Sequence, residues 1–155
     1  MAHTFTCLHL HIVFSTKNRA PLITGPFRQH LFPYMGGIIR QMECTPLLIN
    51  GVDDHVHILT SLSPKIALSD FMKELKSVSS GWAKSAPDGC GDFGWQTGYA
   101  AFSVSKSKEK SAHHYIATQE DHHRRISFQQ EYLALLKKHE IPYDPRFVFE
   151  MEIAG

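Results

Sequence analysis

Hydrophobic and polar positions alternate in several short stretches of this chain, and the period of two predicts strands. Residues 5–15 alternate in this way and are rich in β-branched and aromatic side chains. The runs 45–50 and 56–62 flank the turn 51–54, which predicts an antiparallel hairpin. A last strand is predicted over residues 95–104.

Apolar residues recur at helical spacing between and after these strands. The spacing predicts a helix over 25–42 and a second one that begins near Ser69, a residue type common at helix N-caps. Two more helices are expected over 108–124, which carries a tyrosine, and over 128–139. The order β-α-β-β-α-β followed by helices is typical of the α+β class, with a ferredoxin-like or RRM-like antiparallel sheet and helices on one face.

Composition fits one domain over residues 1–155. The chain is 43% hydrophobic and 20% charged, which suits one folded unit with its own core. Sixteen Lys and Arg against fifteen Asp and Glu give a net charge of +1, so a nucleic-acid site must be a local patch. Three scattered cysteines exclude a disulfide framework. Without a basic-then-apolar leader or ~18 consecutive apolar residues, we expect a cytoplasmic protein with no membrane contact.

Two histidines at the start of a predicted strand are candidate metal ligands. Because side chains alternate along a strand, His55 and His57 project from the same face, where two imidazoles can bind one divalent ion. Two histidines on a sheet can equally be solvated or satisfied within the core. His9 and His11 repeat the pattern on the first strand, where a structural role is the better interpretation.

Tyr115 is the candidate nucleophile. Gln119 and His122 follow at i+4 and i+7, so the three side chains share one stripe of the predicted helix. With the histidine pair, Gln119 could provide a third ligand and leave positions open for a phosphate. A tyrosine on an amphipathic helix is otherwise a core or rim residue, so this interpretation depends on a metal or phosphate nearby.

The chemistry that suits this set is phosphodiester transesterification. A phenol normally titrates near ~10, so it needs a polarised phosphate or a nearby base to attack. The resulting phosphotyrosine keeps the energy of the broken bond, and the chain has no G-x-x-x-x-G-K-[ST] loop. We therefore expect a divalent ion and no nucleotide cofactor. The G-x-G-x-x-G at 89–94 precedes a strand rather than a helix, which excludes a dinucleotide fingerprint.

Basic and hydroxyl side chains near these motifs predict a groove for nucleic acid. Singly, each is expected to be an ordinary surface charge or helix-end serine; together they would bind phosphates. The candidates are Lys17, Arg19, Lys73, Lys76, Ser79 and Ser80.

Five stretches together resemble the single-tyrosine HUH transposases of the insertion-sequence-200 type, or a domesticated REP-associated relative. They cover nearly the whole chain between residues 9 and 140, in the order of the family. They are HIVFSTKNR from His11, DHVHIL from Asp54, LKSVSS from Leu75, WQTGYAAFSVS from Trp95 and YIATQEDHH from Tyr115.

The resemblance implies that His55 and His57 bind Mg²⁺ or Mn²⁺, that Gln119 completes the site, and that Tyr115 attacks single-stranded DNA. The implied product is a 5′-phosphotyrosine with a free 3′-hydroxyl, formed at hairpin-bearing element ends. The resemblance also implies a homodimer joined through sheet edges, a hinge at 105–108 and a nucleoid-associated protein. It assigns no role to His113, His114, His122 or His123.

Two other functions remain open at this point. A catalytically inactive RRM-like nucleic-acid-binding module would bind without a divalent ion. A metal-dependent hydrolase of small phosphoesters would use water and be indifferent to loss of Tyr115.

Overall fold

An antiparallel sheet forms the centre of the protein. The computed structural model describes residues 3–149. Within this range four strands form one sheet in the order β2-β3-β1-β4, with neighbours antiparallel. Their bounds are β1 (His9–Ser15), β2 (Pro46–Val52), β3 (His55–Ser61) and β4 (Ala100–Val104). The α+β class and the antiparallel sheet are confirmed.

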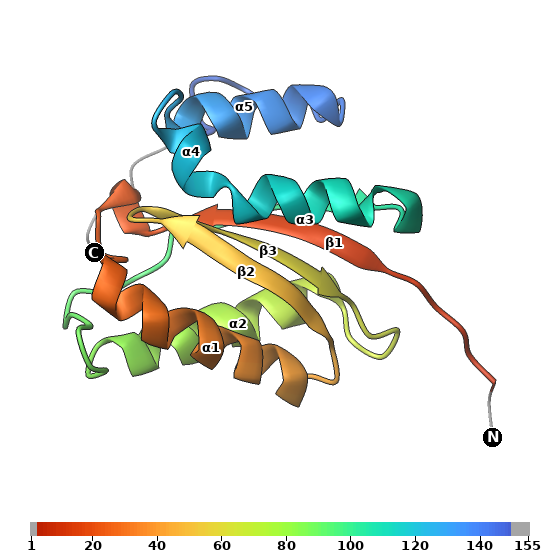
Figure 1. Cartoon of the computed structure of the whole chain (residues 1–155), viewed down its shortest axis with the longest axis horizontal. Helices are drawn as coiled ribbons and strands as arrows, with labels where there is room; N and C mark the ends of the chain where they lie inside the picture. The colour runs from red at the N-terminus through yellow and green to blue at the C-terminus, as the bar shows by residue number, and fades with distance from the viewer. Residues whose placement is uncertain (1–2, 150–155) are drawn as a thin grey trace.

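Two helices cover one face of the sheet, as expected for the β-α-β-β-α-β unit. They are α1 (Gly25–Gln41) and α2 (Leu68–Ala83), which lie side by side in Figure 1. The inward residues Ile12 and Phe14 of β1 pack in the same buried cluster as Phe27 of α1 and Phe71 of α2. This cluster is the larger of the two hydrophobic cores in the described range.

The C-terminal helices cover the opposite face, so helices flank the sheet on both sides (Figure 1). They are α3 (Glu109–Ala117), α4 (Gln119–His123) and α5 (Phe128–Lys138). Val13 and Phe102 of the sheet pack there against Phe128 and Leu135 of α5. Short 3-10 turns, η1 (Lys17–Arg19) and η2 (Lys106–Lys108), follow β1 and β4.

Several element boundaries differ from the sequence prediction. The strand predicted over 95–104 begins at Ala100, with Trp95 forming only an isolated bridge to Thr16. Helix α2 begins at Leu68 after Ala67, so Ser69 is inside the helix rather than its N-cap. The first strand begins at His9 rather than at residue 5.

The helix predicted over 108–124 is broken into two. Thr118 has φ −104° and ψ 27°, outside the helical region, so α3 ends at Ala117 and α4 starts at Gln119. The side-chain amide of Asn50 on β2 donates to the carbonyls of Ile116 (2.9 Å) and Ala117 (3.3 Å). These hydrogen bonds stabilise the break because they satisfy carbonyls that an ending helix leaves without partners.

A search of the described helices for a membrane span finds none that combines the necessary length with the necessary hydrophobicity.

Candidate active site

The tight hairpin between β2 and β3 places the two predicted metal ligands. Val52 pairs with His55 across the turn, so His55 is the first residue of β3. His55 and His57 both project toward α3, α4 and α5, and both are completely buried. Their ring centroids are 5.2 Å apart.

Tyr115 and Gln119 meet this pair from the two sides of the helix break. Tyr115 lies near the end of α3, with its ring centroid 6.0 Å from that of His57. Gln119, the first residue of α4, is buried, and its amide nitrogen donates to the carbonyl of Tyr115 at 3.3 Å. The structure therefore brings together the predicted nucleophile and the three predicted metal ligands.

A carboxylate that the sequence analysis missed lies at the centre of the group. Glu131 on α5 is 1% exposed. Its Oε1 lies 2.9 Å from His57 Nε2, 3.0 Å from His123 Nε2 and 3.4 Å from His55 Nε2. Its Oε2 accepts a hydrogen bond from the Tyr115 hydroxyl. One carboxylate thus contacts both the histidines and the phenol.

The sequence did contain a signal for Glu131. The buried face of α5 consists of Phe128, Tyr132, Leu135 and Leu136, and Glu131 belongs to the same face. A carboxylate on an apolar helical stripe is rarely buried unless it has partners. Its position on this stripe could have indicated a polar site beneath α5.

The break at Thr118 decides which α4 histidine joins the site. On one continuous helix, His122 would follow Tyr115 and Gln119 along a stripe. After the break, His123 Nε2 instead lies 3.1 Å from Gln119 Oε1 and 3.0 Å from Glu131 Oε1. His122 stays outside this group, with Nε2 3.1 Å from the Thr118 hydroxyl and its ring beside that of Tyr115.

Second contacts fix the two β3 imidazoles. Asp54 Oδ1 lies 2.7 Å from His55 Nδ1, and His11 Nε2 lies 2.8 Å from His57 Nδ1. His11 is buried on β1, so its role is to hold His57, which agrees with the structural interpretation. Partners of this kind orient metal-bound histidines and fix which nitrogen is bare. His9 lies apart, 3.3 Å from Glu109.

Burial and hydrogen bonding shift the pKa values within the site. Burial opposes ionisation of Glu131, but its contacts with the imidazoles of His123, His55 and His57 outweigh burial and lower the pKa of this carboxyl. Burial, reinforced by the contact with Glu131, raises the pKa of the Tyr115 phenol. The phenol therefore stays protonated until a stronger electrostatic influence reaches it.

The imidazoles respond differently to the same surroundings. Burial lowers the pKa of His57 to about 4 and that of His11 to about 3. Burial would also lower the pKa of His55, but the hydrogen bond to Asp54 and the nearby Glu131 carboxylate outweigh it, and the pKa is raised. Neutral His57 and carboxylate Glu131 are the protonation states that bind a cation.

The residues present fit a divalent cation. One ligand atom from each of His55, His57, His123 and Glu131 lies within 4.8 Å of every other. The Nε2 atom of His55 is buried and has no hydrogen-bond partner. A buried polar nitrogen without a partner is costly, and a cation among these four atoms would remove that cost.

The predicted nucleic-acid residues are divided between the two sides of the sheet. Lys73, Lys76, Ser79 and Ser80 lie on α2, on the far side of the sheet from Tyr115. Ser79 is buried, accepting from Trp95 Nε1 at 2.9 Å and donating to the Leu75 carbonyl at 2.6 Å.

The ammonium of Lys76 donates to the carbonyls of Gln96, at 2.9 Å, and Gly98. Lys76 and Ser79 thus hold the segment before β4. Lys73 is exposed and Ser80 half-buried.

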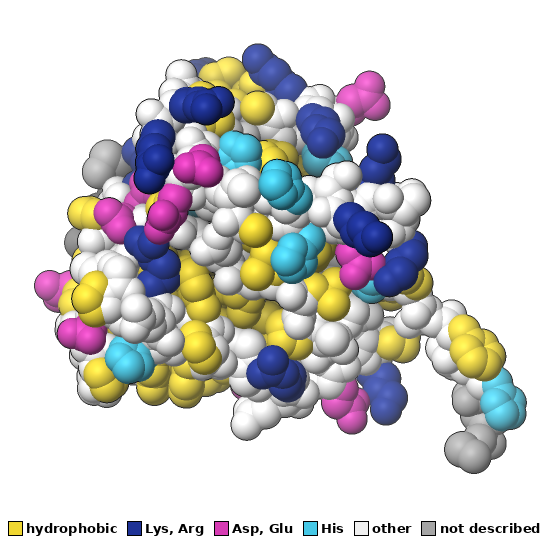
Figure 2. Space-filling view, in the orientation of Figure 1, with side chains coloured by type: hydrophobic (Ala, Val, Ile, Leu, Met, Phe, Trp, Pro, Cys, Tyr) yellow, Lys and Arg dark blue, Asp and Glu magenta, His cyan; other side chains and the backbone are white. Residues whose placement is uncertain are grey.

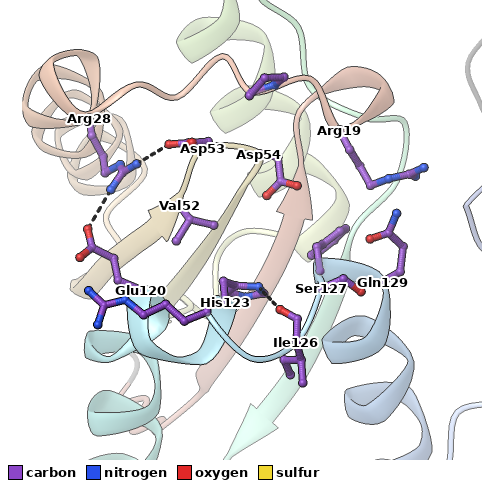
Figure 3. A pocket seen from close by; sticks show the side chains of 13 residues that line it. Arg19, Arg28, Val52, Asp53, Asp54, Glu120, His123, Ile126, Ser127 and Gln129 are labelled. Carbon is purple, nitrogen blue, oxygen red and sulfur yellow. Dashed lines mark hydrogen bonds and ion pairs between the residues drawn. The ribbon is translucent and has the colours of Figure 1, made fainter.

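Two cavities flank the His and Glu group. The first, of about 650 Å³, is lined by Asp54, His123, Arg19 and Arg124, with Arg28 bridging Asp53 and Glu120 at its rim (Figure 3). This places the predicted Arg19 beside the site. Lys17, on the same turn η1, lies next to Gly94 instead, with its backbone N–H 2.8 Å from the Gly94 carbonyl oxygen. The second cavity, of about 680 Å³, is lined by Tyr115, His11, Lys108 and Lys138.

On the face drawn in Figure 2, most Lys and Arg side chains lie over α3–α5 and few over α1.

Comparison with known families matches most of the chain. The family model described as transposase, IS200 like, matches residues 4–119. The ISDra2 transposase TnpA of Deinococcus radiodurans is 26% identical over 119 residues, which are 74% of this chain and 85% of that protein. The transposase for insertion sequence element IS200 of Salmonella typhimurium is 31% identical over 80 residues, 52% of this chain and 53% of that protein.

Solved structures share the fold. A Deinococcus radiodurans protein assigned as a transposase has a TM-score of 0.61 at 23% identity, with 77% of this chain and 95% of that chain covered. A REP-associated tyrosine transposase, determined bound to a REP hairpin, has a TM-score of 0.59 at 15% identity. It covers 100% of this chain and 98% of its own, so the C-terminal helices are included in the similarity.

Proposed function

Because the chain belongs to the IS200-like transposase family, we propose that it cleaves and rejoins single-stranded DNA through a 5′-phosphotyrosine on Tyr115. The observation that supports this most is the shared carboxylate. Glu131 contacts His55, His57 and His123 through one oxygen and the Tyr115 hydroxyl through the other. A nucleophile and a candidate cation site are thus adjacent in one chain.

Each side chain has a distinct task in the proposed reaction. Tyr115 Oη attacks the phosphorus, and its proton passes to an acceptor. The bond from phosphorus to the 3′-oxygen breaks, and that oxygen takes up a proton to leave a free 3′-hydroxyl. His55, His57 and Gln119 would hold a Mg²⁺ or Mn²⁺ ion, which neutralises charge on the non-bridging phosphate oxygens when bound. Rejoining reverses the attack, so no nucleotide hydrolysis is needed.

The two cavities define a path for the DNA strand. One carries Arg19 and Arg124, the other Lys108 and Lys138, and the His and Glu group lies between them. Cationic side chains on both sides hold the phosphates before and after the scissile bond. Tyr115 is only half-buried and lines the second cavity, from which a phosphate reaches its oxygen.

The proposed substrate is DNA with a hairpin next to the cleavage site. A protein of the same fold was determined with a REP hairpin, and we extend that class of ligand to this chain. A homodimer through the sheet edges remains part of the proposal. Because Tyr115 faces the histidines of its own chain, we propose that one protomer supplies a complete set of catalytic side chains.

A denaturing gel tests the proposal. The protein is incubated with Mn²⁺ and hairpin-bearing single-stranded oligonucleotides labelled at either end. We expect a covalent adduct that retains the label downstream of the cut, and a free 3′-hydroxyl on the other fragment. Tyr115→Phe should abolish both products, because it removes only the attacking oxygen. Binding without any adduct would favour the inactive nucleic-acid-binding module, and cleavage by Tyr115→Phe would favour a hydrolase that uses water.

A further inference from the structure

Hydrogen bonds fix which nitrogen of His123 and His55 is bare. The Nδ1 atom of His123 lies 3.0 Å from the carbonyl oxygen of Ile126 (Figure 3). A carbonyl can only accept, so Nδ1 bears the proton and neutral His123 presents a lone pair at Nε2. His55 Nδ1 lies 2.7 Å from the Asp54 carboxylate, so the same reasoning leaves the lone pair of His55 at Nε2.

Both of these unprotonated Nε2 atoms point at oxygen atoms that can accept a hydrogen bond but cannot donate one. His123 Nε2 lies 3.0 Å from Glu131 Oε1 and 3.1 Å from Gln119 Oε1. His55 Nε2 lies 3.4 Å from Glu131 Oε1 and has no hydrogen-bond partner. Acceptors that face one another in a buried space repel unless a proton or a metal cation lies between them.

We propose that His123 and Glu131 are metal ligands together with His55, His57 and the Gln119 amide oxygen. We further propose that this donor set selects a transition-metal ion such as Mn²⁺ over Mg²⁺. The inference deepens the proposed function and rests on it for the identity of the reaction. Glu131 has a second task as a positioning residue, since its other oxygen accepts from Tyr115 and sets the phenol beside the ion.

The distances agree with coordination. Adjacent ligands at ~2.1 Å from an ion lie about 3.0 Å apart in an octahedron and about 3.4 Å apart in a tetrahedron. Glu131 Oε1 is 2.9, 3.0 and 3.4 Å from the three imidazole nitrogens. These separations are those of neighbouring ligands around one ion.

The donor types decide between metals. Mg²⁺ prefers oxygen ligands and retains water, whereas imidazole nitrogens favour transition metals. His55 and His57 alone provide two nitrogens, and His123 raises the number to three. Glu131 provides the negative charge that compensates the ion. Glu131 belongs to α5, outside the residues 4–119 that match the family model, so the family match does not assign it a role.

Direct metal binding by the full-length protein tests the inference without reference to DNA cleavage. Free Mn²⁺ is quantified by its electron paramagnetic resonance signal, and Mg²⁺ binding is measured by competition. We expect wild-type protein to bind Mn²⁺ at least about tenfold more tightly than Mg²⁺. Loss of a residue that only orients a metal ligand typically costs about 10–100-fold in metal affinity, so Glu131→Gln and His123→Asn should each weaken Mn²⁺ binding at least about tenfold. His123→Asn should also reduce the ratio of the affinity for Mn²⁺ to the affinity for Mg²⁺.

Matched variants separate these effects from general damage. Glu74→Gln on α2 and His30→Asn on α1 change exposed residues of the same types on the other side of the sheet, and both should bind Mn²⁺ as wild type does. Thermal melts without metal establish that each variant is folded. If Glu131→Gln fails to fold, His123→Asn still decides, because His123 lies at the cavity wall and is 11% exposed.

The failures of the two proposals are distinguishable. Wild-type affinity for Mn²⁺ in folded His123→Asn and Glu131→Gln would overturn the ligand assignment even if wild-type protein forms the Tyr115 adduct. Equal wild-type affinity for Mg²⁺ and Mn²⁺ would overturn the metal preference. Tight Mn²⁺ binding that depends on both residues, without any adduct, would support the ligand assignment and refute the proposed function.

Discussion

Asn50 ties the tyrosine helix to the sheet, and its removal should loosen Tyr115. Its amide donates to the carbonyls of Ile116 and Ala117, the last residues before the break at Thr118. Because the break lies between Tyr115 and the rest of the site, this amide helps to set the position of the phenol. Asn50→Ala removes both donors without adding bulk.

The magnitude follows from the two hydrogen bonds. One protein hydrogen bond contributes ~1 kcal/mol net, and a carbonyl left without a partner costs ~1–3 kcal/mol when buried. The 2.9 Å bond is part-buried and the 3.3 Å bond exposed, so we expect a loss of about 1–2 kcal/mol in the free energy of unfolding. If the whole loss falls on docking of the helix, the docked population drops by at most about 5–30-fold.

Urea denaturation and single-turnover cleavage at saturating metal measure the two effects. Asn50→Asp keeps the shape but places a carboxylate against two carbonyl oxygens, so its loss should exceed that of Asn50→Ala. Gln41→Ala, an exposed amide at the end of α1, is the control and should change neither quantity. Unchanged stability and cleavage in both Asn50 variants would refute the assignment of the break to this contact.

Three further predictions concern the site. Asp54→Ala should weaken Mn²⁺ binding about 10–100-fold, because it removes the acceptor that orients His55; equal affinity in titrations would count against this role. His11 has a folded pKa of about 3 against 6.5 unfolded, so its contribution is complete above pH 6.5 and is lost as the pH falls; urea denaturation should show about 1 kcal/mol less stability at pH 5.5 than at 7.5 from this group, and His11→Gln should flatten the dependence. Tyr115→Phe mixed with His57→Ala should show no cleavage, whereas recovery of about a quarter of wild-type activity would indicate a site shared across a dimer.

Local periodicity was sufficient to predict half of the site. The period of two on β3 placed His55 and His57 on one face, and that face is the one that α3–α5 cover. The i to i+4 spacing paired Tyr115 with Gln119 and survived the helix break, because the Gln119 amide still contacts the Tyr115 carbonyl. Both patterns operate over four residues or fewer, a range over which backbone geometry alone decides where side chains point.

The other half depended on tertiary contacts that no local pattern specifies. His123 replaced His122 because Thr118 leaves the helical region, and that break is stabilised by Asn50, 68 residues earlier in the chain. Glu131 joined the site because α5 packs against the face of the sheet from which His55 of β3 projects. A carboxylate on an apolar stripe could have indicated a buried polar partner, but not which partner.

The predicted groove for nucleic acid differs from the structure for another reason: residues close to the site in sequence were taken to be close to it in space. Lys76 and Ser79 lie within 22 residues of His57 in sequence, yet α2 packs on the far side of the sheet, and both side chains bind the segment that leads to β4. Because α2 and α3 lie on opposite faces of the sheet, residues on α2 cannot share a groove with α3 unless the nucleic acid wraps around a sheet edge. Arg124 and Lys138 line the two cavities beside the site because they belong to the same layer as Tyr115.

Charge reversal at Arg124 or Lys138 should therefore weaken binding of single-stranded DNA more than charge reversal at Lys73. A salt titration of the three variants by fluorescence anisotropy would test this order.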